Sequence, residues 1–132
     1  MTAGRVTAAE ARARIAGEAE PRSVEVFHHA TLQVKVYAPR DVDRQKPHSR
    51  DEVYVILSGS GTFFDGEERH RLGPGDFLFV AAGRDHRFEH FSDDFATWVL
   101  FYGPEGGEAA NAEPSDGMRV PVDEPIGPQL DA

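Results

Sequence analysis

Three side chains of the types that bind divalent metals stand at the borders of two strand-like segments. His48 and Glu52 are four residues apart, just before the apolar run Val53–Leu57, and His86 follows the apolar segment Phe77–Val80 and a glycine-containing turn. Two imidazoles and one carboxylate on three corners of an octahedron suit Fe(II) with open ligand positions, and also Mn, Ni or Zn. His48, Glu52 and His86 are therefore the candidate metal ligands.

The spacing of His48 and Glu52 sets a geometric condition on this site. On a straight strand, rising ~3.3 Å per residue, the two side chains would stand about 13 Å apart. Two ligands bound to one metal at ~2.1 Å lie only about 3 Å from each other. The intervening Ser49-Arg50-Asp51 must therefore bend sharply, which Ser and Asp tolerate, while His86 arrives from a neighbouring strand.

Other roles are open to the same side chains. The two histidines could be structural, hydrogen-bonded at a barrel rim, and Glu52 could instead pair with an arginine: Arg50, Arg84 or Arg87. His90 shares a strand face with His86 by alternation, which would direct it inward as a neighbour of the ligands. The core is expected to hold Tyr54, Ile56, Phe77, Phe79, Phe88 and Trp98.

A short helix precedes the segments that carry these side chains. Thr7 and Glu10 are spaced as a capping box, alanine-rich sequence continues to Ala16, and Gly17 is a plausible C-cap. Its thin apolar face, formed by Ala8, Ala11 and Ile15, should pack on the main body. Residues 1–22 are thus assigned to a helix and lead-in.

Residues 23–103 read as antiparallel strands separated by Gly, Pro and Asp turns, which predicts an all-β sandwich or barrel. Asp65-Gly66 is the strongest hairpin signal among these turns. Several strands are apolar on both faces, so a second layer, the helix or another subunit must cover the outside, and a homodimer is expected. The strand-like segments are Val24–Phe27, Leu32–Tyr37, Val53–Leu57, Thr62–Phe64, Glu67–Leu72, Phe77–Val80, His86–Phe91 and Phe95–Tyr102.

Composition limits the function classes. The 132 residues fit one domain, and residues 104–132 form a Gly-, Pro- and acid-rich tail. There is no cysteine, which excludes disulfides, zinc–thiolate sites and a thiol nucleophile. The formal charge of −9 disfavours nucleic acid and anionic membranes as partners. Without an apolar run suited to a signal peptide or a membrane span, a cytoplasmic protein is expected.

The two segments that hold the candidate ligands resemble the two sequence motifs of the cupins. The first motif is His-x-His, then Glu, then Gly: His48 matches its second histidine, and Glu52 lies seven residues before Gly59. The second motif, Pro-Gly-Asp leading to Pro-x-Gly-x-x-His, ends at His86, with Ala81 in place of the usual proline. The resemblance covers residues 32–102 and implies a jelly-roll β-barrel, often dimeric, with a metal inside one end.

Lys46 stands where the resemblance expects the first histidine, so the site has three ligands instead of four. Lys46 either points away or stays near the metal to bind an anionic substrate or to move protons, and with Glu52 it is a candidate catalytic residue. The resemblance implies a metal-dependent enzyme acting on a small organic molecule, with oxygenase chemistry favoured over isomerase, cyclase or lyase chemistry. A non-catalytic cupin that binds a sugar or small metabolite is the alternative, and a purely structural interaction protein ranks last.

Overall fold

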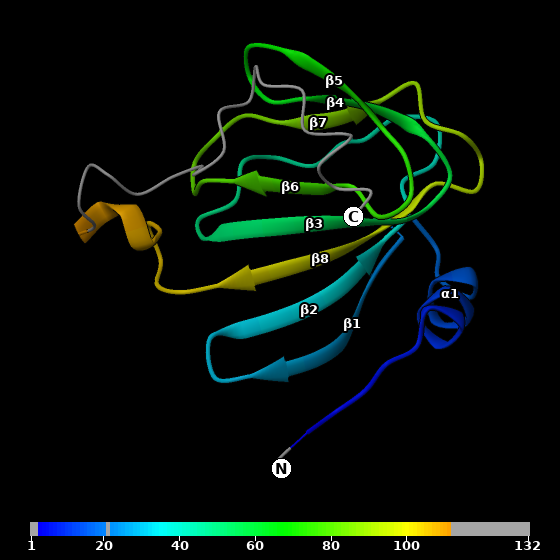
Figure 1. Ribbon diagram of the computed structural model, residues 1–132, viewed down its shortest axis with the longest axis horizontal. Helices are drawn as coiled ribbons and strands as arrows, with labels where there is room; N and C mark the ends of the chain where they lie inside the picture. The colour runs from blue at the N-terminus through cyan, green and yellow to red at the C-terminus, as the bar shows by residue number, and fades with distance from the viewer. Residues whose placement is uncertain (1–2, 21, 112–132) are drawn as a thin grey trace, which may run out of the picture.

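The computed structural model describes residues 3–20 and 22–111, and confirms the all-β architecture with one short N-terminal helix (Figure 1). Each strand expected from the sequence is present, although some bounds differ. In chain order the elements are α1 (Ala8–Ala16), β1 (Ser23–His29), β2 (Leu32–Tyr37), β3 (Asp51–Ser58), β4 (Gly61–Phe64), β5 (Arg69–Leu72), β6 (Phe77–Val80), β7 (Arg87–Glu89), β8 (Ala96–Tyr102) and a 3₁₀ helix, η1 (Glu108–Asn111).

Two antiparallel sheets face each other, which is the layered arrangement of a jelly roll. The larger sheet has the order β1-β2-β8-β3-β6 and the smaller one the order β5-β4-β7, and Figure 1 shows the smaller sheet above the larger one. β8, the last strand, pairs with both β2 and β3, so the chain must cross between layers before it closes the larger sheet. The core between the sheets consists of Tyr54, Ile56, Phe63, Leu72, Val80, Phe88, Phe95 and Val99.

Helix α1 covers part of the outer face of the larger sheet. Thr7 is its N-cap, accepting a hydrogen bond from the Glu10 backbone N–H, and its hydroxyl donates to the Glu10 carboxylate. Ala11 and Ile15 are buried against the sheet, whereas Ala8, expected on the same face, is exposed. The helix therefore contributes packing and leaves the interior of the barrel to the strands.

The hairpin between β4 and β5 is longer than Asp65-Gly66 predicted. Phe64 pairs with Arg69, so four residues form the loop and the return strand begins at Arg69 instead of Glu67. The Asp65 carboxylate accepts hydrogen bonds from the backbone N–H groups of Glu67 and Glu68. These bonds hold both residues in the loop and keep them out of the ladder.

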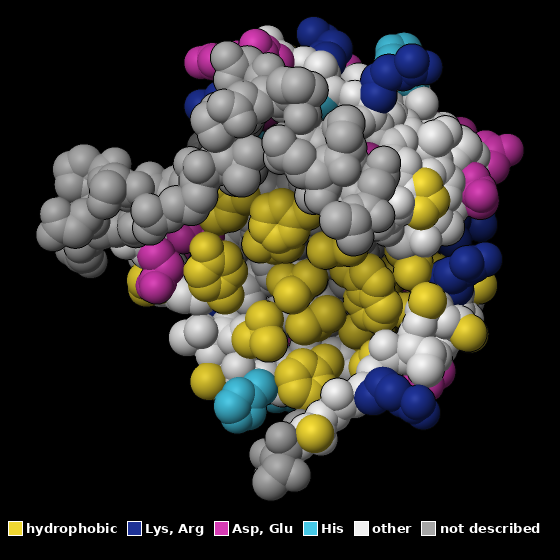
Figure 2. Space-filling view, viewed as in Figure 1, with side chains coloured by type: hydrophobic (Ala, Val, Ile, Leu, Met, Phe, Trp, Pro, Cys, Tyr) yellow, Lys and Arg dark blue, Asp and Glu magenta, His cyan; other side chains and the backbone are white. Residues whose placement is uncertain are grey.

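The part of the larger sheet that α1 leaves uncovered is apolar on its outer side (Figure 2). Phe77 and Phe79, expected in the core, are 58% and 45% exposed because β6 lies at the sheet edge and these two side chains point outward. Residues that pair with Phe77 and Phe79 across the neighbouring strands extend this apolar surface from β6 to β3, and further pairs extend it to β8, β2 and β1. We define the outer apolar face as Phe27, Val34, Val53, Val55, Phe77, Phe79, Trp98 and Leu100.

The beginning of the segment predicted as a tail is tied to the strands. The Gly106 N–H donates to the Ser49 carbonyl, and the Glu108 N–H donates to the Asp51 carboxylate. The rest of that prediction, residues 112–132, lies outside the described residues. Among the described residues, α1 and η1 are both too short and too polar to cross a membrane.

Candidate metal centre

The bend that the site requires lies immediately before strand β3. Residues 38–50 belong to no helix or strand, and β3 begins only at Asp51. The His48 carbonyl accepts a hydrogen bond from the Gly83 N–H at 2.7 Å, and the Asp51 carboxylate accepts one from the Ala82 N–H at 2.9 Å. The chain therefore turns ahead of Glu52, and His48 Nε2 comes within 3.8 Å of Glu52 Oε1.

His86 reaches the same point from the loop that precedes β7. Its side chain has no exposed surface, and its Nδ1 lies 2.8 Å from the Arg84 carbonyl. Because a carbonyl only accepts hydrogen bonds, Nδ1 carries a proton. The other nitrogen, Nε2, faces Glu52 Oε1 at 2.9 Å. Donor atoms of His48, Glu52 and His86 all lie within 4.8 Å of one another, which is the preorganised arrangement that a metal site needs.

The carboxylate of Glu52 is buried beside imidazoles, without a lysine or arginine partner among the described residues. Glu52 is 1% exposed, and its nearest polar neighbours include His86 Nε2 at 2.9 Å and His48 Nε2 at 3.8 Å. The arginines considered as alternative partners bind elsewhere: Arg50 to the Gly103 carbonyl, Arg84 to the Asp65 carbonyl and Arg87 to Glu89. A buried carboxylate in this state is costly unless a cation lies beside it. The donor set and this buried acid therefore fit a divalent ion.

The two histidines have different electrostatic surroundings. Burial lowers the pKa of His48, and the negative charge of Glu52 offsets this only in part. Burial also disfavours the charged form of His86, but its contact with Glu52 and its hydrogen bond to the Arg84 carbonyl outweigh burial and raise its pKa. His48 is therefore the imidazole held more firmly in the neutral form that binds metals.

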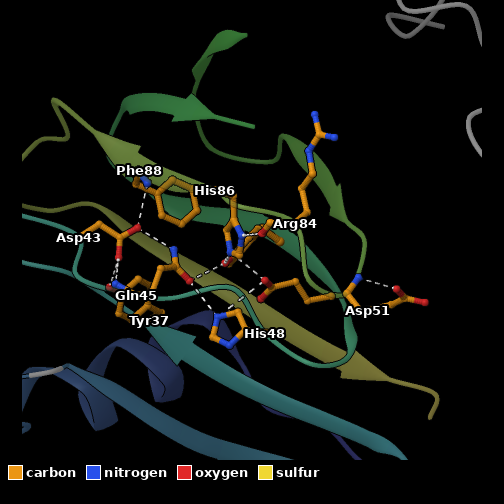
Figure 3. A network of polar contacts seen from close by, with 11 residues as sticks. Tyr37, Asp43, Gln45, His48, Asp51, Arg84, His86 and Phe88 are labelled. Carbon is orange, nitrogen blue, oxygen red and sulfur yellow. Dashed lines mark hydrogen bonds and ion pairs between the residues drawn. The ribbon is translucent and has the colours of Figure 1, made fainter. Parts of the chain in front are cut away.

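Sequence reasoning missed a network of polar side chains around these three residues (Figure 3). Tyr54, expected only as a core residue, places its hydroxyl 3.0 Å from both His86 Nε2 and Gln45 Oε1. Burial, followed by the negative charges of Glu52 and Asp43, raises the pKa of Tyr54 well above its usual value. Strand alternation from Glu52 to Tyr54 is the signal that could have placed this hydroxyl in the site.

His90 and Lys46, which the sequence offered as possible neighbours of the site, are both exposed in the structure. His90 does not turn inward: β7 ends at Glu89, and His90 is exposed with φ of 49°, which breaks the strand alternation. Lys46 is exposed and does not line the cavity beside the site. Lys35, on β2, does line it. The structure thus brings His48, Glu52 and His86 together and leaves Lys46 outside.

A cavity of about 160 Å³ opens beside His48 and Glu52. His48, Glu52 and Tyr54 form one side of it, and Val99 and Phe101 form an apolar side. Its size suits a small organic molecule, and its apolar wall limits the access of water. Other residues that line it are Ser23, Lys35, Tyr37 and Gln45.

Comparison with known proteins adds independent findings. A family profile described as a cupin domain matches residues 33–102. An uncharacterized protein of Streptomyces coelicolor is 41% identical over 84 residues, which are 62% of this chain and 80% of that protein. Acireductone dioxygenase of Rhodopseudomonas palustris is 44% identical over 45 residues, or 31% of this chain and 27% of that enzyme.

Dimethylsulfoniopropionate lyase DddQ of Ruegeria pomeroyi is similar in both sequence and structure. It is 37% identical over 57 residues, which are 42% of this chain and 28% of the lyase. Its crystal structure matches with a TM-score of 0.54 and 27% identity, over 61% of this chain and 46% of that one. The match thus spans less than half of the lyase, and it shows the jelly-roll fold.

Proposed function

Because the chain belongs to the cupin family, we propose that it is a metal-dependent enzyme that acts on a small organic molecule. His48, Glu52 and His86 would hold a divalent ion, and the observation that carries this proposal is the buried carboxylate of Glu52 between two imidazoles whose donor atoms lie within 4.8 Å of one another. An ion bound there supplies Lewis-acid chemistry and, if it is iron, chemistry with oxygen. The side chains around the site indicate how the protein would bind and orient a substrate beside the ion.

The residues around the donor groups can bind, orient and shield a substrate. Val99 and Phe101 restrict water on the apolar side of the cavity. The Tyr54 hydroxyl keeps its proton because its pKa is raised, and it can donate a hydrogen bond to a substrate oxygen in place of Gln45 Oε1, its acceptor in this structure. Glu52 lowers the net positive charge of the site.

The charge of the cavity favours an anionic substrate. Lys35 lines the cavity and is half-buried, so its ammonium group meets less competition from water than an exposed lysine would. A carboxylate or an enolate would place its negative charge there. This role, considered for Lys46 from the sequence, passes to Lys35 because Lys46 is exposed outside the cavity.

Oxygenase-type chemistry is favoured over isomerase, cyclase or lyase chemistry. Two histidines and one carboxylate leave open positions for both substrate and oxygen, and similarity to an acireductone dioxygenase supports this choice. Similarity to a lyase supports the competing reaction class. Oxygen uptake by the protein loaded with ferrous iron would favour oxygenase chemistry over lyase chemistry. A non-catalytic module that binds a small metabolite is the alternative, and it would release its ligand unchanged.

We also propose that the protein is a homodimer joined through the outer apolar face. The side chains of this face form continuous cross-strand rows, and all of them are apolar. Pairing with a second copy would cover Phe77 and Phe79, which are the most exposed of them.

Metal content by elemental mass spectrometry tests the proposed function. The protein is purified without metal-affinity resin, beside His86→Ala and the control His29→Ala, which alters an exposed histidine of β1. We expect near-stoichiometric metal in the native protein and the control, and at least a tenfold loss in His86→Ala. Absence of metal from the native protein, even after reconstitution with Fe(II), Mn, Ni and Zn, would rule out the metal-dependent enzyme and favour the non-catalytic module that binds a small metabolite.

A further inference from the structure

The orientation of one side-chain amide beside the metal centre is fixed by a buried acid. Gln45 lies in the irregular segment before β3, and its Nε2 donates to Asp43 Oδ2 at 2.6 Å. An ionised carboxylate accepts hydrogen bonds and cannot donate them. The amide nitrogen must therefore face Asp43, and the amide oxygen, Oε1, must face the site. Figure 3 shows Gln45 between Asp43 and His48 in this orientation.

The amide oxygen lies among the donor atoms of the proposed metal centre. Gln45 Oε1 is 3.0 Å from His48 Nε2 and 3.0 Å from the Tyr54 hydroxyl. The same hydroxyl is 3.0 Å from His86 Nε2, which is 2.9 Å from Glu52 Oε1. Glu52 Oε1 is in turn 3.8 Å from His48 Nε2 and completes a ring of five polar atoms.

Two separations between proposed ligands in this ring are those expected of neighbours on one ion. Adjacent ligands bound at ~2.1 Å in an octahedron lie about 3 Å apart. Gln45 Oε1 lies 3.0 Å from His48 Nε2, and His86 Nε2 lies 2.9 Å from Glu52 Oε1, whereas the pair formed by His48 and Glu52 is wider at 3.8 Å. The Tyr54 hydroxyl is a hydrogen-bonding neighbour of Gln45 and His86 and not a member of the ligand set. Gln45 Oε1 thus occupies a ligand-like position beside His48.

Asp43 is itself held by both sheets. It is 7% exposed, and its carboxylate accepts hydrogen bonds from the Tyr37 hydroxyl at 2.5 Å and the Phe88 N–H at 2.8 Å. Tyr37 belongs to β2 in the larger sheet and Phe88 to β7 in the smaller one. The Gln45 backbone N–H donates to the same carboxylate at 3.1 Å. Asp43 therefore has little freedom to release the amide.

We propose that Gln45 is a fourth protein ligand of the metal, bound through its amide oxygen, and that Asp43 is the positioning residue that aims this oxygen. The inference rests on the proposed metal centre and extends it. Two imidazoles, one carboxylate and one amide oxygen would leave two positions of an octahedron open. Oxygen donors of this kind favour Mn and Fe(II) over softer ions. The neighbouring Lys46 is exposed and has no part in this ligand set.

Binding of Mn(II), measured by isothermal titration and by the Mn(II) electron paramagnetic resonance signal, tests the ligand assignment. Gln45→Met keeps the length of the side chain but replaces the oxygen with a soft sulfur that Mn(II) binds poorly. We expect its dissociation constant to rise about 10- to 100-fold. Gln33→Leu is the matched control: Gln33 lies beside His48, but its amide bonds to Glu25, so this variant should bind Mn(II) as the native protein does.

Asp43→Asn tests the positioning role separately. An asparagine amide can donate to Gln45 Oε1 and turn the Gln45 nitrogen toward the metal, so affinity should fall about tenfold. If Asp43 acts only through Gln45, the double variant should bind Mn(II) as weakly as Gln45→Met alone, with no added loss. Thermal melting of each variant establishes that it is folded before its affinity is compared.

The outcomes separate the two proposals. Native affinity in folded Gln45→Met, together with lost affinity in His86→Ala, would overturn the Gln45 assignment and leave the three-ligand centre intact. Native affinity in Gln45→Met and in His86→Ala would overturn both, because the ion would then bind elsewhere. If Gln45→Met does not fold, Asp43→Asn decides: unchanged affinity and an unchanged Mn(II) signal in that variant would exclude Gln45 as an oriented ligand.

Discussion

Lys35 and Lys46 offer a direct comparison of two cations near one site. Lys35 lines the cavity and Lys46 is exposed outside it. We expect Lys35→Met to weaken the binding of acetate, a minimal carboxylate, to the Mn(II)-loaded protein about tenfold, which is the effect of losing a partly desolvated charge pair. Isothermal titration measures the affinity. Lys46→Met is the control, and a larger loss in that variant would return the anion-binding role to Lys46.

The three candidate ligands could be identified from the sequence, but the residues that surround them in the structure could not. His48, Glu52 and His86 follow from spacing around two turns, and Tyr54 could have been placed by strand alternation from Glu52. Gln45 lies in residues 38–50, which have no periodicity to indicate where a side chain points. Its direction is set by Asp43, through bonds to strands far away in the sequence.

Among the elements, the strands were predictable because each combines β-branched or aromatic residues with turn signals at both ends. The errors arose where a side chain competes with the backbone ladder. Asp65 bonds to two successive N–H groups and lengthens the β4–β5 loop, and the left-handed conformation of His90 ends β7 early. Neither effect appears in a pattern of apolar residues, since both depend on local hydrogen bonding and backbone conformation.

The β4–β5 loop gives a pH-dependent contribution to stability. Burial of Asp65 opposes its charge, but hydrogen bonds from the backbone N–H of Glu68, from His70 and from the N–H of Glu67 outweigh it and lower the pKa to about 2. In the unfolded chain the pKa is about 3.9. The carboxylate therefore stabilises the fold above about pH 4, and this contribution is lost as the pH falls toward 2.

Urea unfolding of Asp65→Asn beside the native protein measures this contribution. The native protein should have the higher free energy of unfolding near neutral pH, and the difference should shrink as the pH falls below about 4. Asp93→Asn, at an exposed loop position, is the control. A difference that stays constant over this pH range would mean that the Asp65 charge does not stabilise the loop.

At the scale of the whole molecule, the outer apolar face determines the expected assembly. Light scattering after size exclusion should give twice the chain mass for the native protein and the mass of one chain for Phe79→Asp, because a buried unpaired charge would oppose the contact. Val42→Asp is the control, since Val42 is 55% exposed but lies off this face. A native mass of one chain would rule out the homodimer, whereas a Phe79→Asp dimer would place its interface on another surface.

The bridge that Asp43 makes between β2 and β7 also bears on the order of events in folding. The site needs Asp43 bonded to Phe88, 45 residues further along the chain, and His86 beside Glu52. Contacts this distant in sequence form late, after long loops have closed. An ion that binds only the finished site would slow unfolding while leaving the folding rate unchanged. Loaded molecules would then resist proteases longer than empty ones whenever cleavage is faster than refolding.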